Sequence, residues 1–142
     1  MHWAERIADR IIKRKPDKEE YVCAAGISPS GSIHIGNFRD IATSLFVAKA
    51  LVKKGKKARI LFSWDEYDRF RKVPANVKDI DPENKMEQYI GRPYTDVPNT
   101  FATEHENYAK YFEAEFMESI KKFGIELDYR YQTEMYTSGK YR

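Results

Sequence analysis

The chain has 142 residues, enough for one domain that buries about two-thirds of the surface its unfolded form would expose. Charged residues make up 33% of the sequence, and no apolar run approaches the roughly 18 residues of a membrane span, so we expect a soluble protein with no membrane association. The first residues carry no secretory signal, which makes the cytoplasm the expected location.

The first predicted elements are a helix and a strand. Trp3, Ile7 and Ile11 recur every four residues, which predicts an amphipathic helix of about 13 residues. The continuous apolar run at 21–25 then predicts a strand buried on both faces of a parallel sheet. Cys23, the only cysteine, lies in this run and is expected to pack in the core, so the segment offers neither a disulfide nor a cysteine-based zinc site.

A second helix and a second strand follow. Apolar side chains from Phe38 to Val52 mark one face of a helix that should stop at Gly55, and the run from Ala58 to Trp64 predicts a strand. Strand, helix and strand in this order form a right-handed unit with parallel strands, and ligands of such sheets bind beyond the carboxyl ends of the strands. We therefore expect an α/β fold: a Rossmann-like parallel sheet with flanking helices.

The later part of the chain is less regular. Four prolines and weak periodicity at 74–98 predict an irregular insertion, with one helical turn near 83–89. Thr103 and Glu106 then fit a capping box for a last helix. The aromatic stripe of that helix is expected to pack in the core, and a third strand is predicted at 125–131.

The most informative segment joins the first strand to the second helix and reads Gly26-Ile-Ser-Pro-Ser-Gly-Ser-Ile-His-Ile-Gly-Asn37. A strand, a Gly/Ser/Pro turn and a helix N-terminus bring free backbone N–H groups and the positive helix end to one point, which suits a phosphate. His34 offers an imidazole donor there, and Gly36 leaves room for a nucleotide to approach the backbone. His2 and His105 have no comparable setting and are assigned to the surface or to packing.

The residues His34-Ile35-Gly36-Asn37, placed after Pro29-Ser30-Gly31, resemble the His-Ile-Gly-His signature of class I aminoacyl-tRNA synthetases. Class I lysyl-tRNA synthetases carry the Asn ending, and the resemblance to them extends to the block Trp64–Pro74 and to the opening His2-Trp3-Ala4. It covers essentially the whole chain. The resemblance implies that residues 1–142 are the N-terminal half of a class I synthetase catalytic domain, of the HUP-type Rossmann-like fold.

The resemblance also implies a function, that of a lysine–tRNA ligase. Such an enzyme uses ATP, bound with Mg²⁺, to activate lysine as lysyl-adenylate, and then transfers lysine to tRNA(Lys). The protein holds the reactants in line and stabilises charge on the phosphate oxygens. His34 and Asn37 are then the catalytic residues, one donating to phosphate and the other keeping a neutral donor beside it, and no metal site formed by the protein is seen. The ATP-binding residues implied are Pro29, Ser30, Gly31, His34, Gly36 and Asn37.

Asp65, Glu66 and Asp68 form a second group at the end of the second strand. They fit a solvated acidic loop paired with Arg69 and Arg71, but a substrate with two ammonium groups also needs carboxylates near it. By resemblance to glutamyl-specific relatives, Asp65 would receive the α-amino group of the substrate. Asp68 and Arg69 would shape the loop.

The choice of amino acid follows from the first strand. Gly26 and Ser28 correspond to family positions that line the amino-acid pocket, so the resemblance makes them lysine-binding residues with Asp65. Ala24 stands where the glutamyl enzymes have an arginine that binds the substrate carboxylate. Losing that cation disfavours an acidic amino acid, whose carboxylate would be left unpaired, and favours lysine.

Lysine and arginine exceed aspartate and glutamate by only three, 25 against 22, too few to indicate a dedicated nucleic-acid-binding protein. Two basic clusters are still candidates for phosphate contacts. The cluster at 53–57 is better explained as a solvated helix C-terminus that complements the helix dipole. The cluster of Arg69, Arg71 and Lys72 is the better candidate.

Class I synthetases also need a second signature loop, Lys-Met-Ser-Lys-Ser, and an anticodon-binding region, and this sequence shows neither. Lys85-Met86 continues as Glu87-Gln88 and is a coincidence. We therefore expect the N-terminal piece of a longer enzyme. Two alternatives stay open: a non-catalytic module that holds a nucleotide or lysine, and a small nucleotidylyltransferase of the same superfamily. The latter usually has a Gly-x-Phe-type turn in place of Ser28-Pro-Ser-Gly31.

Overall fold

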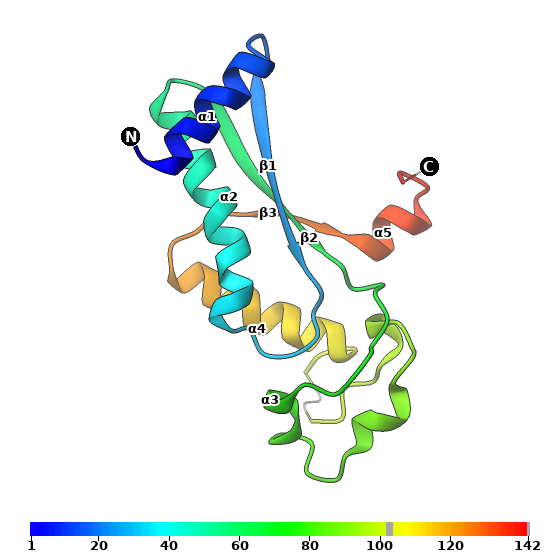
Figure 1. Ribbon diagram of the computed structural model, residues 1–142. Helices are drawn as coiled ribbons and strands as arrows, with labels where there is room; N and C mark the ends of the chain where they lie inside the picture. Colours follow the sequence, from blue (N-terminus) through cyan, green and yellow to red (C-terminus); the bar gives the residue numbers. More distant parts are fainter. Residues whose placement is uncertain (102–103, 142) are drawn as a thin grey trace.

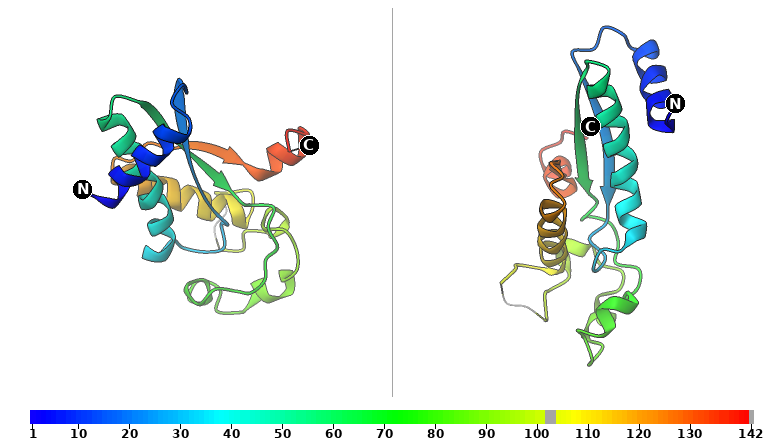
Figure 2. Two further views of the ribbon diagram at one scale, coloured as in Figure 1. Left: turned by 45° about the horizontal axis from the view of Figure 1, so that its top comes forward. Right: turned by 90° about the vertical axis from the view of Figure 1, so that its left-hand side faces the viewer.

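The computed structural model describes residues 1–101 and 104–141, and Figure 1 and Figure 2 show their arrangement from three directions. A parallel sheet lies at the centre, with its strands in the order β1-β2-β3. This confirms the predicted Rossmann-like α/β fold, in which helices flank a parallel sheet. The strands are β1 (Glu20–Ile27), β2 (Lys57–Trp64) and β3 (Asp128–Tyr131).

Helices precede, join and follow the strands. The helix between β1 and β2 ends where the sequence predicts: Lys54 caps it, and Gly55 follows with a φ of 77°, a conformation that side chains disfavour. No helix in the described ranges is long and apolar enough to cross a membrane. The helices are α1 (Trp3–Arg14), α2 (Ile35–Lys53), α3 (Ala75–Lys78), α4 (Tyr108–Lys122) and α5 (Gln132–Thr137), with 3₁₀ turns η1 (Lys85–Tyr89) and η2 (Tyr94–Asp96).

The helices α2 and α4 cover the same face of the sheet. Buried side chains alternate along β2 and mark that face. Ile60, Phe62 and Trp64 are buried. Phe62 stacks on Phe116 of α4, with ring centroids 5.0 Å apart, and both belong to a cluster that includes Ile41 of α2. Removing these large apolar side chains from water holds both helices on the sheet.

The first strand was predicted to be buried on both faces, and this is wrong. Tyr21 and Ile27 are buried, but Val22 is 43% exposed. Because α2 and α4 lie on the same face, the side chains of β1 that point the other way remain in contact with water. Cys23 points to the covered face, where it packs half-buried against the α1–α2 core, and burial raises the pKa of its thiol.

A separate hydrophobic core lies in the segment between β2 and α4, residues 65–107, which Figure 1 shows below the sheet. Phe70 and Val77 are fully buried there against Tyr108 and Phe112 of α4. The short elements α3, η1 and η2 belong to this segment. The core therefore ties an otherwise irregular connection to the main helix α4.

The last part of the chain differs from its prediction in detail. Asn107 is the N-cap of helix α4, and its Oδ1 accepts a hydrogen bond from the Lys110 N–H at 3.0 Å. The predicted capping box includes Thr103, which lies outside the described residues. The third strand is shorter than the predicted 125–131, because it starts only where Leu61 of β2 pairs with Asp128.

The packing of α4 on the sheet gives a stability prediction. Phe116→Ala should lower the free energy of unfolding by about 3–5 kcal/mol, because a fully buried ring stacked on Phe62 would be replaced by a cavity. Phe123→Ala is the matched control at the end of the same helix. Phe123 is 69% exposed, so its loss should cost less than about 1 kcal/mol. Urea unfolding of both variants is the measurement, and equal losses would contradict this account of the core.

Candidate nucleotide and amino-acid site

The two segments predicted to form the site leave the same edge of the sheet. Strands β1 and β2 are parallel, and Ile27 pairs with Trp64 at their carboxyl ends. The N–H of Asp65 continues the pairing with a hydrogen bond of 2.9 Å to the carbonyl of Ile27. The signature loop, residues 28–34, therefore begins beside the acidic group that follows β2, as expected for a site beyond the strand ends.

His34 is the N-cap residue of α2. Its Nδ1 accepts a hydrogen bond from the Gly36 N–H at 3.1 Å, and the backbone N–H of His34 donates to Asn37 Oδ1 at 3.3 Å. The two bonds form a capping box, which satisfies backbone donors at the start of the helix. Because Nδ1 acts as an acceptor, the neutral imidazole carries its proton on Nε2. The side chain is exposed, so this N–H is a donor available at the helix N-terminus.

Gly36 and Asn37 both help to set the position of His34. A Cβ on Gly36 would lie 2.9 Å from His34 Nδ1 and Cε1, so only glycine lets the ring fold back onto the helix. The side-chain oxygen Oδ1 of Asn37 accepts a hydrogen bond from the backbone N–H of His34. The geometry thus gives both residues a positioning role that needs no ligand, in addition to the nucleotide contacts expected from the sequence.

Two side chains from elsewhere in the chain hold the carbonyl groups of the signature loop. Tyr108 of α4 donates from Oη to the Ser30 carbonyl at 2.6 Å. Asn76 of α3 donates from Nδ2 to the Ser32 carbonyl at 2.8 Å. Burial raises the pKa of Tyr108, so its hydroxyl stays protonated and remains a donor. The loop is therefore fixed by groups that lie 78 and 44 residues away along the chain.

Gly31 is buried where the signature loop meets α3. A Cβ at this position would lie 3.1–3.2 Å from Asn76 Oδ1, Pro74 Cγ and Val77 Cγ2. Pro29 is buried as well. The glycine and proline that the sequence assigned to ATP binding thus face protein packing. Ser30, which stands between them, lines the cavity beside His34.

Asp65 is half-buried at the end of β2. Burial raises the pKa of its carboxyl, the neighbouring Asp68 raises it further, and the positive charge of Arg130 works against the rise. Asp68 accepts a hydrogen bond from Ser28 Oγ at 2.8 Å, which joins the signature loop to the strand end. A cation placed beside Asp65 would relieve the unfavourable charge, which is the chemistry expected for binding an ammonium group.

Glu66 does not belong to this acidic group. Its side chain is 1% exposed and accepts hydrogen bonds from Lys110 Nζ at 3.0 Å and from the Thr133 N–H at 3.3 Å. Lys110 also bonds Glu113 at 3.0 Å and lies 4.3 Å from the centre of the Tyr131 ring. This buried cluster joins β2, α4 and α5, so Glu66 is a structural residue.

Arg69 and Gly26 have packing roles. Arg69 forms an isolated antiparallel bridge with Pro93, and its guanidinium lies beside Gly91, which fits the loop-shaping role expected from the sequence. The N–H of Gly26 donates to Asp40 at 3.3 Å. A Cβ on Gly26 would lie 2.8 Å from the Ser63 carbonyl, so close packing of β1 on β2 explains the glycine.

Arg130 is a residue that the sequence analysis missed. Its Nε donates to Ser63 Oγ at 2.9 Å, and its charge reaches Asp65. The hydrophobic pattern places Arg130 in a strand but gives no sign that β3 lies next to β2, and only the parallel register brings Arg130 opposite Ser63.

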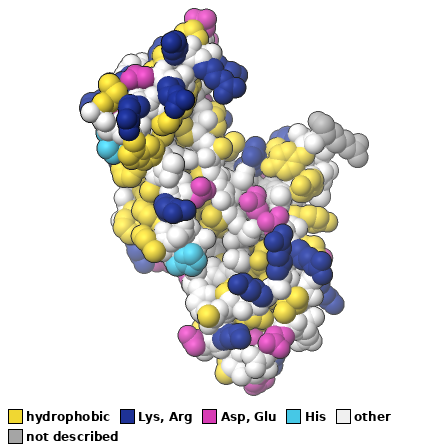
Figure 3. Space-filling view, in the orientation of Figure 1, with side chains coloured by type: hydrophobic (Ala, Val, Ile, Leu, Met, Phe, Trp, Pro, Cys, Tyr) yellow, Lys and Arg dark blue, Asp and Glu magenta, His cyan; other side chains and the backbone are white. Residues whose placement is uncertain are grey.

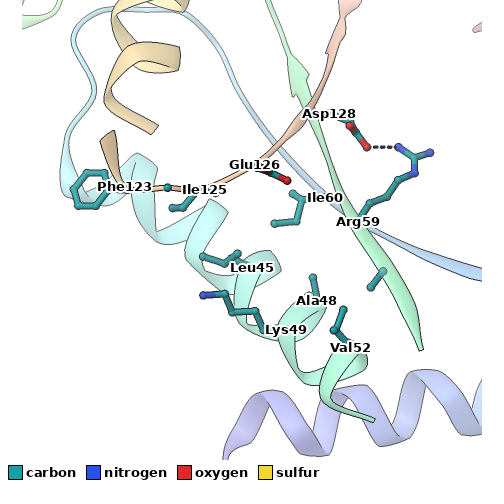
Figure 4. A pocket seen from close by; sticks show the side chains of 12 residues that line it. Leu45, Ala48, Lys49, Val52, Arg59, Ile60, Phe123, Ile125, Glu126 and Asp128 are labelled. Carbon is teal, nitrogen blue, oxygen red and sulfur yellow. Dashed lines mark hydrogen bonds and ion pairs between the residues drawn. The ribbon is translucent and has the colours of Figure 1, made fainter. Parts of the chain in front are cut away.

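A surface cavity of about 630 Å³ opens beside His34. A second cavity of about 460 Å³ lies between α2, β2 and the connection from α4 to β3. Figure 4 shows that Arg59 and Asp128 pair across its rim, with apolar side chains such as Leu45 and Ile60 inside. None of the predicted site residues lines this second cavity. Within the described residues, no group of three or more His, Cys, Asp or Glu side chains could hold a metal ion.

Comparison with known proteins places these features in a family. A family model described as "tRNA synthetases class I (K)" matches residues 1–142. The chain belongs to this family of class I tRNA synthetases.

Curated relatives named lysine–tRNA ligase are similar over 99% of the chain. They include the proteins of Pyrococcus horikoshii, Thermococcus kodakarensis and Treponema pallidum, which are 45%, 47% and 43% identical to it. The chain spans only 26% of the length of each of these three proteins.

The buried cluster predicts a pH dependence of stability. Burial and the adjacent Glu66 carboxyl raise the pKa of Glu113 from 4.5 to about 8. Between these values the folded protein holds a proton that the unfolded chain has released. The free energy of unfolding should therefore fall as the pH rises from about 5 to 8. The lowered pKa of Glu66 acts oppositely, but only as the pH falls below 4.5.

Glu113→Gln tests this assignment, because it keeps the neutral shape and removes the titration. The fall in unfolding free energy between about pH 5 and 8 should become much shallower in this variant. Glu118→Gln is the matched control: Glu118 lies exposed on the same helix, and its partner Lys122 lowers its pKa. Urea unfolding across the pH range is the measurement. A Glu113→Gln slope equal to that of the unmodified protein would show that Glu113 is already ionised.

Proposed function

We propose that this chain is the ATP- and lysine-binding N-terminal part of a lysine–tRNA ligase. The observation that carries the proposal is the capping box of His34, Gly36 and Asn37, which leaves His34 Nε2–H as a donor at the N-terminus of α2. Membership of the class I tRNA synthetase family and the names of the relatives support it. The complete enzyme would work in the cytoplasm on lysine, ATP and tRNA(Lys).

Activation of lysine requires charge stabilisation more than a protein nucleophile. The lysine carboxylate attacks the α-phosphorus of ATP, the bond to the bridging oxygen breaks, and pyrophosphate leaves with the electron pair. Negative charge grows on the phosphate oxygens, so a fixed donor such as His34 Nε2–H binds the transition state more tightly than the ground state. The Gly36 N–H holds the imidazole by donating to Nδ1, and Asn37 accepts from the backbone N–H of His34. Mg²⁺ bound with ATP would neutralise part of the phosphate charge.

Selection of lysine would fall to the acidic end of β2. The raised pKa of Asp65 marks a carboxyl whose ionised form is poorly solvated, and an ammonium group of the substrate would stabilise it. Asp68 accepts a hydrogen bond from Ser28, which joins the signature loop to the strand end near Asp65. Ala24 supplies no cation for an acidic substrate.

His34 gives the first test of the proposed function. His34→Ala in the complete enzyme should lower lysine-dependent pyrophosphate exchange about a hundredfold to a thousandfold, because one transition-state donor is lost. His34→Asn is the matched control, because asparagine is a good N-cap residue but lacks Nε2–H. Both variants should lose the rate, and both should bind lysine normally. Exchange near the unmodified rate in His34→Asn would show that His34 serves only to cap the helix.

Asp65 gives the second test. Asp65→Asn should raise the Michaelis constant for lysine and leave that for ATP nearly unchanged, because a charged contact would become a neutral hydrogen bond about half as strong. Asp79→Asn, an exposed position just after α3, serves as the control and should change neither constant. Pyrophosphate exchange driven by lysine, glutamate and glutamine measures both effects. Exchange driven by glutamate, or an unaltered lysine constant, would overturn the assignment.

A further inference from the structure

Two cations, Arg71 and Lys72, line the cavity beside His34, and the function proposed above gives them no role. The volume of this cavity is about 630 Å³, and it opens to the surface between the signature loop and the start of α3. His34 and Ser30 lie on one side, and Arg71 and Lys72 come from the connection after β2. No aspartate or glutamate lines it. An anion would therefore meet donors and positive charge from two separate segments.

Arg71 and Lys72 are free to bind a ligand. Both side chains are exposed, and neither forms an ion pair or a side-chain hydrogen bond within residues 1–101 and 104–141. Two other cations show the contrast: Lys110 bonds two carboxylates, and Arg59 bonds Glu20 and Asp128. Figure 3 shows Lys and Arg side chains at the upper end of the molecule, over α1, and also over the lower part, which holds the segment 65–107.

The backbone on both sides of these cations is fixed. Phe70 is fully buried, its N–H donates to the Arg92 carbonyl at 2.8 Å, and its carbonyl accepts from the Gly91 N–H at 2.7 Å. On the other side, Pro74 starts α3, which Asn76 ties to the signature loop. Arg71 and Lys72 thus stand on a short span anchored to the same loop that presents His34.

We propose that Arg71 and Lys72 bind the β- and γ-phosphates of ATP and the pyrophosphate that leaves, an assignment that rests on the function proposed above. The lysine carboxylate oxygen forms the new bond to the α-phosphorus, and the bond from that phosphorus to the β-bridging oxygen breaks. The electron pair stays on the leaving pyrophosphate. Two cations at the leaving group stabilise this charge while His34 acts on the same chain of phosphates.

The neighbouring cations mark the limits of the site. Arg69 precedes Arg71 in the sequence, but its guanidinium packs beside Gly91 and does not line the cavity. Lys78 on α3 is exposed and does not line it either. Tyr94 lines the cavity together with Arg71. Burial and the charge of Asp68 raise the pKa of the Tyr94 hydroxyl, and the Ser30 hydrogen bond and the charge of Arg71 work against that rise.

The test compares the Arg71→Ala/Lys72→Ala double variant of the complete enzyme with a Lys78→Ala control. Calorimetric binding of inorganic pyrophosphate should weaken by about tenfold for each cation removed, because each charged hydrogen bond lost costs about that factor. The Michaelis constant for ATP in pyrophosphate exchange should rise similarly, with that for lysine unchanged. Lys78→Ala should match the unmodified enzyme, and Lys72→Arg should keep most of the affinity. Unchanged pyrophosphate binding in the double variant would overturn the proposal.

A second arm separates ATP from RNA as the source of phosphate. Transfer of lysine from preformed lysyl-adenylate to tRNA should proceed normally in the double variant. Normal pyrophosphate binding with slow transfer would assign the cations to RNA and overturn the proposal. The same measurements separate the anion site from the ligase function. If the unmodified enzyme binds pyrophosphate through Arg71 and Lys72 but shows no lysine-dependent exchange, the anion site is supported and the ligase function is not.

Discussion

The hydrogen bonds that hold the signature loop are the constraint on which the rest of the site depends. Residues 28–34 run from the end of β1 to the start of α2 outside the sheet, so their carbonyl groups need donors from elsewhere. Tyr108 supplies one to Ser30 and Asn76 supplies another to Ser32. Two hydroxyl groups of the loop add bonds of their own: Ser28 Oγ donates to Asp68, and Ser32 Oγ donates to Glu115.

This dependence explains why an irregular segment is packed around its own core. The segment 65–107 buries Phe70 and Val77 against α4, and that packing places both Tyr108 and Asn76 under the loop. The hydrophobic free energy of this small core is thereby coupled to the geometry of the site. The same segment supplies the acidic residues at the end of β2 and the cations of the cavity wall. One packing unit thus presents groups suited to an ammonium group and to phosphate.

Sequence reasoning predicted the parts of this structure that depend on local pattern. The apolar run of β1, the helix that stops at Gly55 and the run of β2 predict a parallel unit, and the structure confirms it. The position of the loop follows from that order. Exposure of Val22 was not predicted, because an apolar run does not reveal which faces of a sheet the helices cover.

Contacts between distant residues could not be predicted. In the sequence, Glu66 forms an acidic group with Asp65. In the structure it is buried and accepts a hydrogen bond from Lys110, which lies 44 residues further along the chain. The packing of Gly31 against α3 was also hidden, because a four-residue helix shows no periodicity. At Gly36 the structure adds a local reason for glycine, because a Cβ there would meet the imidazole of His34, and the nucleotide contact expected from the sequence stays a prediction.

In the structure, His34 accepts a hydrogen bond through Nδ1, and we propose that its Nε2–H donates to the phosphates of ATP. Nitrogen NMR of the imidazole in the complete enzyme tests it most directly, because the two ring nitrogens are resolved and their protonation is observed. We expect a proton on Nε2 alone in the neutral ring. Addition of a non-hydrolysable ATP analogue should shift the Nε2 resonance while Nδ1 remains an acceptor. A proton on Nδ1 in the neutral ring, or resonances unmoved by saturating analogue, would contradict it.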